Sequence, residues 1–248
     1  MLIESSSNPK IKKWAKLKQK KYRYQLNEFI VEGEHLVLEA IKAGVTKEIL
    51  IREGSIFPLE KIEVSDVTIY TLKENLFSQI ASTETPQPIM AICEMKNIEI
   101  KNQNRLLLLD RVQDPGNLGT LLRSAVAFEF DGVILGDGCV DLYNEKVIRS
   151  TQGAIFKLAV KYQPLSETIL DLKEKGVKIY GTSLQNGKPL GEIKPTPQMA
   201  FILGNEGSGV SSELLSLTER NIFIEMSENI ESLNVSIAGS IIMYHFRP

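Results

Sequence analysis

The chain has 248 residues, enough for one large domain or two smaller ones, and its 43% hydrophobic and 24% charged residues are typical of a soluble globular protein. A net charge of −2 gives by itself no sign of a nucleic-acid partner, but the charge is unevenly distributed. Residues 1–25 hold eight basic residues and one acid, and the remainder carries a charge of −9. This split predicts a basic arm facing a polyanion, attached to an acidic body.

Several classes of protein are disfavoured by what the sequence lacks. Cys93 and Cys139 lie far apart and form no disulfide framework, which favours a reducing cytoplasm. With only His35 and His245 beside them, zinc-finger spacing is absent, and we expect no metal. No apolar run approaches the length of a membrane span, and the first residues lack the features of a signal peptide, so we expect no membrane partner.

The first part of the chain predicts a small α/β domain. A helix is expected over 8–25, because Ile11, Trp14 and Leu17 form an apolar stripe with lysines on the other face, and Pro9 suits the first turn. The further elements expected are strands at 29–31, 48–52, 67–72 and 89–95 and helices at 33–43 and 73–81.

The second part alternates strands and helices after a polar linker at 97–104. Strands are expected at 105–110, 132–135, 177–183, 199–203 and 222–226, with helices at 117–128, 144–150, 165–174 and 234–246. This alternation predicts an α/β fold with a mostly parallel sheet and helices on both faces.

Three common catalytic motifs are absent from the chain. The phosphate loop fails because five residues separate Gly181 from Gly187, and the dinucleotide fingerprint fails because Asp141 replaces its third glycine. The nucleophile elbow fails because Glu206 replaces its first glycine. These failures argue against nucleotide hydrolysis, hydride transfer and ester hydrolysis.

Three polar segments follow predicted strands. In the segment that begins DPGNLG, Asn117 lies at a cap position and Arg123 about two turns into the helix. In the loop GNEGSG, three glycines let the backbone approach a ligand, with Glu206 at the centre. In the segment SLNVSIAG, Asn234 and Ser236 open the last helix.

Each segment also has a purely structural explanation. The asparagines can be helix caps, Arg123 a solvated side chain, and the glycine loop a tight connection between a strand and a helix. Together, however, the segments lie at the carboxyl ends of three strands, the edge where open α/β sheets bind ligands.

The motifs NLGTLLRSA, ILGNEGSGV and SLNVSIAG resemble, in order and spacing, the signature motifs of the SpoU/TrmH class of SPOUT RNA methyltransferases, over roughly residues 104–246. The pattern SSxxNPxIK from Ser6 onward resembles the L30e-like substrate-binding domain of the rRNA-modifying branch. The resemblance implies an L30e-like domain at 1–96, a linker at 97–104 and a methyltransferase domain at 105–248. It also implies a deep trefoil knot and a homodimer with its active site at the subunit interface.

The activity implied is transfer of a methyl group from S-adenosylmethionine to a ribose 2′-hydroxyl in structured RNA, with 23S ribosomal RNA favoured. By motif position, the catalytic residues implied are Arg123, Asn117, Glu206, Asn234 and Ser236. The cofactor-binding residues implied are Thr182, Leu203, Gly204, Gly209, Ile224, Met226 and Leu233. The third motif of the family usually reads I-P-M; here Glu225 replaces the proline, which restores a backbone N–H and adds a charge.

These residue types suit the chemistry. Displacement at a sulfonium methyl needs no metal, but the ribose hydroxyl must be aligned and must lose its proton. Arginine ordinarily stays protonated, so we prefer an orienting, phosphate-clamping role for Arg123; a base with a lowered pKa is the alternative, and the sequence does not separate the two.

The basic arm is expected to contact RNA phosphates. The residues expected to do so are Lys10, Lys12, Lys13, Lys20, Lys21 and Arg23. Trp14, Tyr22 and Tyr24 are candidates for stacking on unpaired bases. The structural alternatives are a core position for Trp14 and a simply solvated face for the lysines.

Three competing functions remain open at the sequence level. One is a tRNA 2′-O-methyltransferase, although minimal enzymes of that kind lack the L30e-like domain. Another is a non-catalytic RNA-binding or ribosome-assembly protein that retains the knot. A methyltransferase of small molecules would leave the basic arm unexplained. The nucleotide modified is not specified by the sequence.

Overall fold

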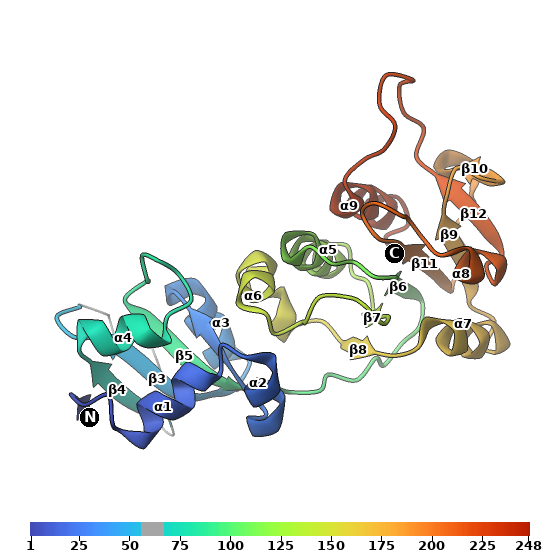
Figure 1. Ribbon diagram of the computed structural model, residues 1–248. Coiled ribbons are helices and arrows are strands. Elements are labelled where there is room, and N and C mark those ends of the chain that lie inside the picture. The colour runs from blue at the N-terminus through green and yellow to red at the C-terminus, as the bar shows by residue number, and fades with distance from the viewer. Residues whose placement is uncertain (56–66) are drawn as a thin grey trace. The chain divides into compact units, whose positions relative to one another are not determined.

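The computed structural model describes residues 1–55 and 67–248, which form two compact units (Figure 1). The first unit comprises Met1–Lys96 and Asp141–Lys157; the second comprises Asn97–Val140 and Leu158–Pro248. A segment from the middle of the chain therefore packs with the N-terminal part.

The first unit is built on a mixed sheet with the strand order β1-β4-β3-β5-β2. Its strands are β1 (Leu2–Ile3), β2 (Glu28–Glu32), β3 (Thr46–Arg52), β4 (Thr68–Leu72) and β5 (Ile89–Glu94). Strand β3 runs parallel to β4 and antiparallel to β5. The helices are α1 (Pro9–Lys16), α2 (Lys20–Leu26), α3 (Glu34–Lys42), α4 (Glu74–Ile80), α6 (Glu145–Thr151) and the 3₁₀ turn η2 (Ala154–Phe156).

The prediction of one helix over 8–25 is wrong, because the chain breaks between α1 and α2. Helix α1 begins as expected, with the Asn8 side chain accepting from the Lys10 N–H and a proline in the first turn. At the break, the guanidinium of Arg23 donates to the carbonyls of Leu17 (2.9 Å) and Lys18 (2.8 Å). This side chain satisfies carbonyls that a continuous helix would have bonded internally.

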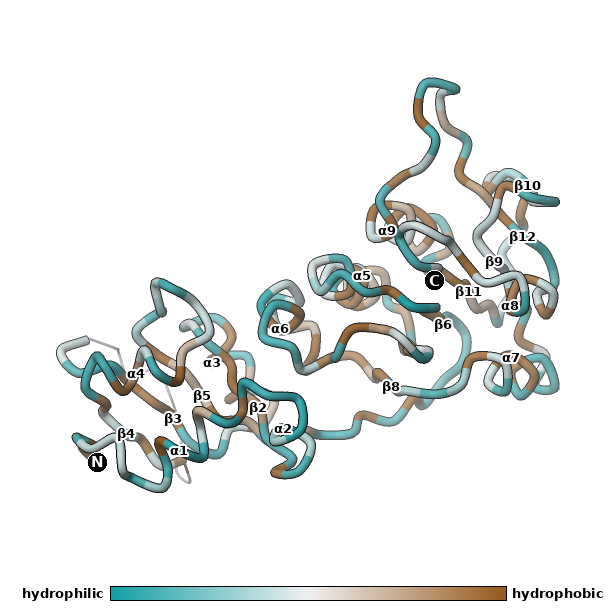
Figure 2. Tube along the Cα trace, viewed as in Figure 1, coloured by the Kyte–Doolittle hydropathy of each residue, from teal (hydrophilic) through white to brown (hydrophobic). Residues whose placement is uncertain are grey.

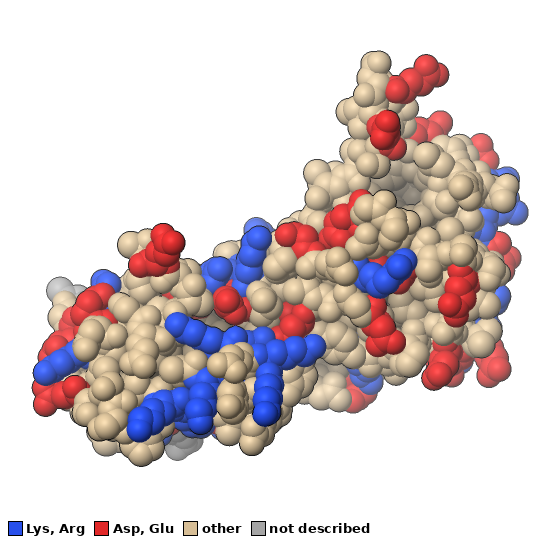
Figure 3. All heavy atoms as spheres, in the orientation of Figure 1, with Lys and Arg blue, Asp and Glu red and all other residues tan. Residues whose placement is uncertain are grey.

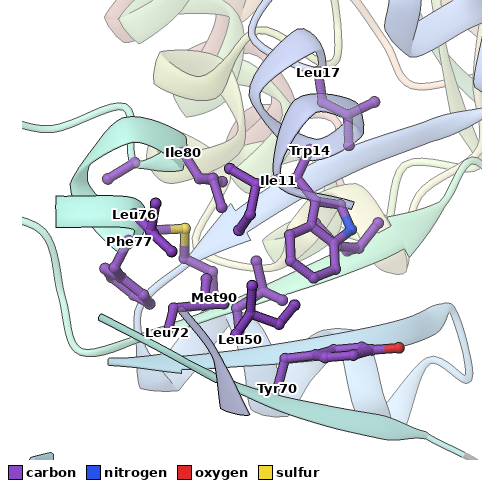
Figure 4. Packing of buried hydrophobic residues seen from close by; sticks show 13 residues of the cluster. Ile11, Trp14, Leu17, Leu50, Tyr70, Leu72, Leu76, Phe77, Ile80 and Met90 are labelled. Carbon is purple, nitrogen blue, oxygen red and sulfur yellow. The ribbon is translucent and has the colours of Figure 1, made fainter. Parts of the chain in front are cut away.

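Trp14 is a core residue, as the structural alternative held. Its side chain is fully buried and belongs to the apolar cluster shown in Figure 4, edge-on to Tyr70 with 5.3 Å between ring centroids. The indole Nε1 donates to Glu48 at 2.7 Å, so the polar end of the ring is satisfied. Stacking of Trp14 on RNA bases is therefore ruled out, while Tyr24 remains exposed.

The second unit is built on a sheet in which every pair of neighbouring strands is parallel, which confirms the predicted α/β class. The strand order is β10-β12-β9-β11-β6-β7-β8. The strands are β6 (Arg105–Leu109), β7 (Gly132–Leu135), β8 (Val160–Tyr162), β9 (Lys178–Thr182), β10 (Gly187–Pro189), β11 (Met199–Leu203) and β12 (Arg220–Phe223). The helices are α5 (Pro115–Ala127), α7 (Leu165–Glu174), α8 (Ser212–Ser216), α9 (Val235–His245) and the 3₁₀ turn η3 (Leu190–Glu192).

Burial on both faces explains the apolar runs of the central strands. All residues of β6 and β11 are buried. In Figure 2, β11 is coloured as hydrophobic, whereas α2, an element of the first unit, is coloured as hydrophilic. The expected strand at 222–226 ends earlier, at Phe223, so Ile224 and Met226 lie in the loop that follows. Within the described parts of the chain, no helix has the length and apolar character needed to cross a membrane.

Helices α5 and α9 pack closely through a glycine. A Cβ atom on Gly239 would lie 2.4 Å from Leu121 Cδ2 and 2.5 Å from Leu203 Cδ1. The hydroxyls of Ser124 and Ser240 hydrogen-bond across the same contact at 2.7 Å. This close approach brings the start of α9 to the start of α5 and the end of β11, where the three polar segments lie.

Candidate active site

Asp114, and not Asn117, caps helix α5. The Asp114 carboxylate accepts a hydrogen bond from the Asn117 backbone N–H at 2.8 Å. The predicted cap role of Asn117 is therefore wrong, and because Asp114 performs it, the Asn117 side chain is free to bond elsewhere.

Four of the predicted catalytic residues form one hydrogen-bonded series, here called the polar row: Glu206, Asn117, Asn234 and Ser236. The Asn117 amide donates to Glu206 Oε1 at 3.0 Å and accepts from Asn234 Nδ2 at 2.9 Å. Asn234 Oδ1 in turn accepts from the Ser236 hydroxyl at 2.6 Å and from the backbone N–H of Ser236 at 2.9 Å. Asn234 therefore caps α9, as expected, and also joins the three segments.

Glu206 anchors one end of the polar row. Its carboxylate also accepts from the backbone N–H groups of Gln113 (3.4 Å) and Asp114 (3.2 Å). Partial burial acts to raise the pKa of Glu206, but the hydrogen bonds from Asn117 and the backbone outweigh it, so the pKa lies below its ordinary value. An ionised acceptor at this end fixes the Asn117 amide, with its oxygen turned to Asn234.

The glycine-rich loop is held by Asn205, which sequence reasoning missed. Its Oδ1 accepts from the N–H groups of Gly207 (3.0 Å) and Ser208 (3.1 Å), and its Nδ2 donates to the Arg111 carbonyl at 3.0 Å. An asparagine that opens a glycine loop is a recognised turn signal and would have identified this role.

Gly204 is required by a close backbone approach. A Cβ atom there would lie 2.1 Å from the carbonyl carbon of Gly209 and from the nitrogen of Val210. The loop therefore folds directly back on the end of β11.

Arg123 is exposed on α5 and lies outside the polar row. Within the described residues, its guanidinium makes no hydrogen bond or ion pair. A position six residues from Asn117 faces a different side of the helix, which agrees with this separation. Its guanidinium is thus available to a ligand.

A cavity of about 180 Å³ opens beside the start of α9. Four of the predicted cofactor residues, Thr182, Ile224, Met226 and Leu233, line it; Leu203, Gly204 and Gly209 do not. The full lining is Thr182, Ser183, Leu184, Ile222, Phe223, Ile224, Met226, Glu231, Ser232, Leu233, Ala238 and Ile242. A second cavity of about 390 Å³ shares five of these residues: Leu184, Phe223, Ile224, Met226 and Glu231.

The predicted RNA-binding residues differ in their surroundings. Lys12, Lys20 and Lys21 are exposed. Lys10 instead pairs with Glu48, and Lys13 pairs with Glu28 at 2.6 Å.

Arg23 is not an exposed phosphate contact. It is 4% exposed and pairs with Asp141 at 2.5 Å, so its role in this structure is internal. Figure 3 shows lysine and arginine side chains gathered on the side of the first unit that carries α1 and α2.

Comparison with known proteins identifies the family. The profile of the SpoU rRNA Methylase family matches residues 104–244. The chain belongs to this family. A second profile, the MRM3-like substrate binding domain, matches residues 8–91. The resemblance predicted from the three motifs is therefore confirmed.

Relatives of the SpoU chain are similar over its whole length. The 23S rRNA (guanosine(2553)-2′-O)-methyltransferase RlmP of Bacillus subtilis is 46% identical over 99% of this chain and 98% of its own. The AdoMet-bound crystal structure of an rRNA methyltransferase from Sinorhizobium meliloti has a TM-score of 0.88 and 26% identity, covering 100% of this chain and 97% of that one. An RNA 2′-O ribose methyltransferase has a TM-score of 0.84 and 26% identity, with 99% and 97% covered.

The cavity suits S-adenosylmethionine, the cofactor implied by this family. Its walls are mainly apolar, as an adenosyl group requires, and Ser183, Glu231 and Ser232 supply a few polar groups. The shared lining joins it to the second cavity.

Proposed function

We propose that this SpoU protein is an S-adenosylmethionine-dependent RNA 2′-O-ribose methyltransferase acting on 23S ribosomal RNA. The observation that carries the proposal is the meeting of three motif segments in the polar row, at the same helix start that lines the apolar cavity. The enzyme class expected from the motifs is confirmed by the relatives, which are methyltransferases of this kind.

S-adenosylmethionine supplies a methyl group on a sulfonium, which is reactive enough to need no metal. Thr182, Ile224, Met226 and Leu233, which line the apolar cavity, would hold this cofactor, and the backbone at Leu203, Gly204 and Gly209 shapes the neighbouring loop. The polar row fixes these segments relative to one another, which preorganises the site.

Arg123 binds the phosphate next to the reacting ribose. Arg123 is exposed, and the planar guanidinium of an arginine suits clamping and charge stabilisation better than proton removal. Its planar fork donates two parallel hydrogen bonds to a phosphate and so orients the adjacent 2′-hydroxyl.

The same guanosine that the Bacillus relative modifies is the target we propose here. Support comes from 46% identity that extends through both the substrate-binding and the catalytic parts. The ribosomal substrate also accounts for the match of residues 8–91 to a substrate-binding domain. The domain boundaries 1–96, 97–104 and 105–248 remain part of the proposal; the two profile matches, over 8–91 and 104–244, support a division of the chain near residue 100. A cytoplasmic location belongs to the same proposal, because it follows from the proposed ribosomal substrate.

A homodimer is the second element of the proposal, together with the trefoil knot of the family. Helix α9 exposes an apolar stripe: Ile237 is 53% exposed, Ile241 37% and Tyr244 55%. A stripe at this spacing is typical of a helix face that packs on another helix. A second copy that covers it would complete the active site at the interface. Replacing Ile237 and Ile241 together by Glu is expected to give monomers in light scattering; retained dimers would contradict this arrangement.

The test of the function uses purified protein, S-adenosylmethionine carrying a labelled methyl group, and three RNAs. The first is the 23S rRNA segment around the proposed guanosine, the second is the same segment synthesised with a 2′-deoxy sugar at that nucleotide, and the third is tRNA. Label is expected in the first RNA alone. Equal labelling of the first two, or labelling of tRNA only, would overturn the proposed substrate. Cofactor binding without methylation of any RNA would favour the non-catalytic alternative.

A further inference from the structure

Glu231 occupies a distinctive position in the candidate cofactor site. It belongs to the long loop between β12 and α9, seen in Figure 1 standing out from the sheet of the second unit. Among the described residues that line the first cavity it alone is ionisable, and it lines the second cavity as well. Its carboxylate makes no hydrogen bond or ion pair with any described residue, so it is available to a ligand.

The other charges near Glu231 have the same sign. Glu225 and Glu228 line the second cavity, and neither cavity has a lysine, arginine or histidine among its described lining residues. A ligand that extends from the first cavity into the second therefore meets negative charge. Attraction between such charges and a cation is stronger at a partly apolar wall than in bulk water.

We propose that Glu231 makes the site prefer the sulfonium cofactor S-adenosylmethionine over its demethylated product S-adenosylhomocysteine. This inference rests on the proposed function. The two molecules differ by one methyl group and one positive charge, because the product carries a neutral thioether. A carboxylate at the junction of the cavities attracts the charged form and loses that attraction once the methyl has been transferred, which favours release of the product.

The experiment measures affinity by calorimetry, without turnover, for wild-type protein and for Glu231→Gln. Three ligands are compared: S-adenosylmethionine, S-adenosylhomocysteine, and sinefungin, which carries a protonated amine in place of the sulfonium. We expect the variant to bind both cationic ligands about tenfold more weakly and the neutral product within about twofold of wild type, from charge attraction at a partly screened distance. Added salt should reduce the preference of the wild-type protein for the cationic ligands over S-adenosylhomocysteine, because salt screens the charge attraction.

Glu213→Gln is the matched control, because Glu213 is an exposed carboxylate on α8 that lines neither cavity. It should leave all three affinities unchanged. If Glu231→Gln binds all three ligands more weakly by the same factor, the carboxylate binds a group that they share. If the variant binds all three with wild-type affinity, the carboxylate does not face the cofactor. Either result overturns the inference. If wild-type protein binds none of the ligands, the proposed function fails as well.

Discussion

Asp114 caps helix α5, and Asn117 bridges the polar row. The sequence motif alone would allow Asn117 to be the cap. Asp114 satisfies the backbone N–H at the start of α5, and its own N–H donates to Glu206. Asn117 therefore keeps both ends of its amide for side chains that come from two other strand ends. An amide suits this position because it donates to a carboxylate on one side and accepts from a second amide on the other.

Replacement of Arg123 by Lys tests its role at the scale of a single residue. Lysine keeps the charge but presents a point donor in place of a planar fork, so it cannot hold a phosphate by two parallel hydrogen bonds. We expect methyl transfer to fall by about 100-fold or more, while affinity for S-adenosylmethionine changes by less than about twofold. Labelled-methyl transfer and calorimetry measure the two quantities.

The control for Arg123→Lys is Arg220→Lys, at an exposed arginine that begins β12. It is expected to retain full activity. Near-normal methylation by Arg123→Lys would exclude a specific role for the guanidinium.

At the scale of elements, the contact between α5 and α9 is set by Gly239. A Cβ atom there would overlap Leu121 and Leu203, both of which are buried. We expect Gly239→Ala to lower the free energy of unfolding by about 1–2 kcal/mol, because overpacking outweighs the helix propensity that alanine gains. Leu203 directly precedes Gly204, so the same shift should also reduce methyl transfer. Urea unfolding measures the stability.

Gly191→Ala is the matched control for the urea unfolding of Gly239→Ala. A Cβ atom at Gly191 meets nothing within 4 Å, so the variant should unfold within about 0.5 kcal/mol of wild type. If Gly239→Ala is as stable as Gly191→Ala, the two helices are able to separate without loss, contrary to the close packing described above.

Elements with a strong local pattern were predictable from the sequence. The strands at 132–135 and 199–203 and the helix at 165–174 have the expected boundaries, because their apolar residues match the burial pattern. The break between α1 and α2 was not predictable, since residues 17–20 contain no glycine or proline that would mark it. Its cause is tertiary: Arg23, which bonds carbonyls at the break, is also paired with Asp141.

In the candidate active site too, some features were predictable from the sequence and others depend on tertiary contacts. The motif residues of the polar row were identifiable, because polar groups at the ends of parallel strands meet at one edge. The separate roles of Asp114 and Asn205 depend on which side chain reaches which backbone group, and the burial of Arg23 depends on a partner 118 residues away in sequence. The row of lysines before Arg23 gives no local sign of that partner.

At the scale of the whole molecule, Glu39 links the two segments of the first unit. It is buried on α3 and pairs with Lys157 at 2.6 Å, from the segment 141–157, and with Lys42 at 3.0 Å. Hydrogen bonds from Lys157 and then Lys42 lower the pKa of Glu39 from 4.5 to about 2. Because the folded pKa is the lower one, this contribution to stability is complete above about pH 5 and is lost as the pH falls toward 2.

Glu39→Gln should therefore destabilise the protein at pH 7, because it removes both ion pairs. The expected loss is only about 1–2 kcal/mol, because the partner lysines are largely exposed and solvent screening weakens the pairs. The difference from wild type should shrink by more than half by pH 3. Urea unfolding between pH 7 and pH 3 measures it. Glu34→Gln, at an exposed position of the same helix, serves as control and should show no such trend. A difference independent of pH would mean that the ion pairs of Glu39 do not contribute.

The uneven charge of the chain predicts how it binds RNA. An acidic body repels the polyanion, so affinity should depend on the exposed lysines of α1 and α2, and each phosphate contact made by such a lysine releases counterions. Replacing Lys12, Lys20 and Lys21 by Gln is expected to weaken RNA binding and to reduce the slope of log affinity against log salt by about 2. Filter binding across a salt series measures both effects.

The control replaces Lys175, Lys178 and Lys194, which are exposed on the second unit, and so changes the net charge equally. If both triple variants lose the same affinity and slope, RNA responds to total charge and the basic arm has no special role.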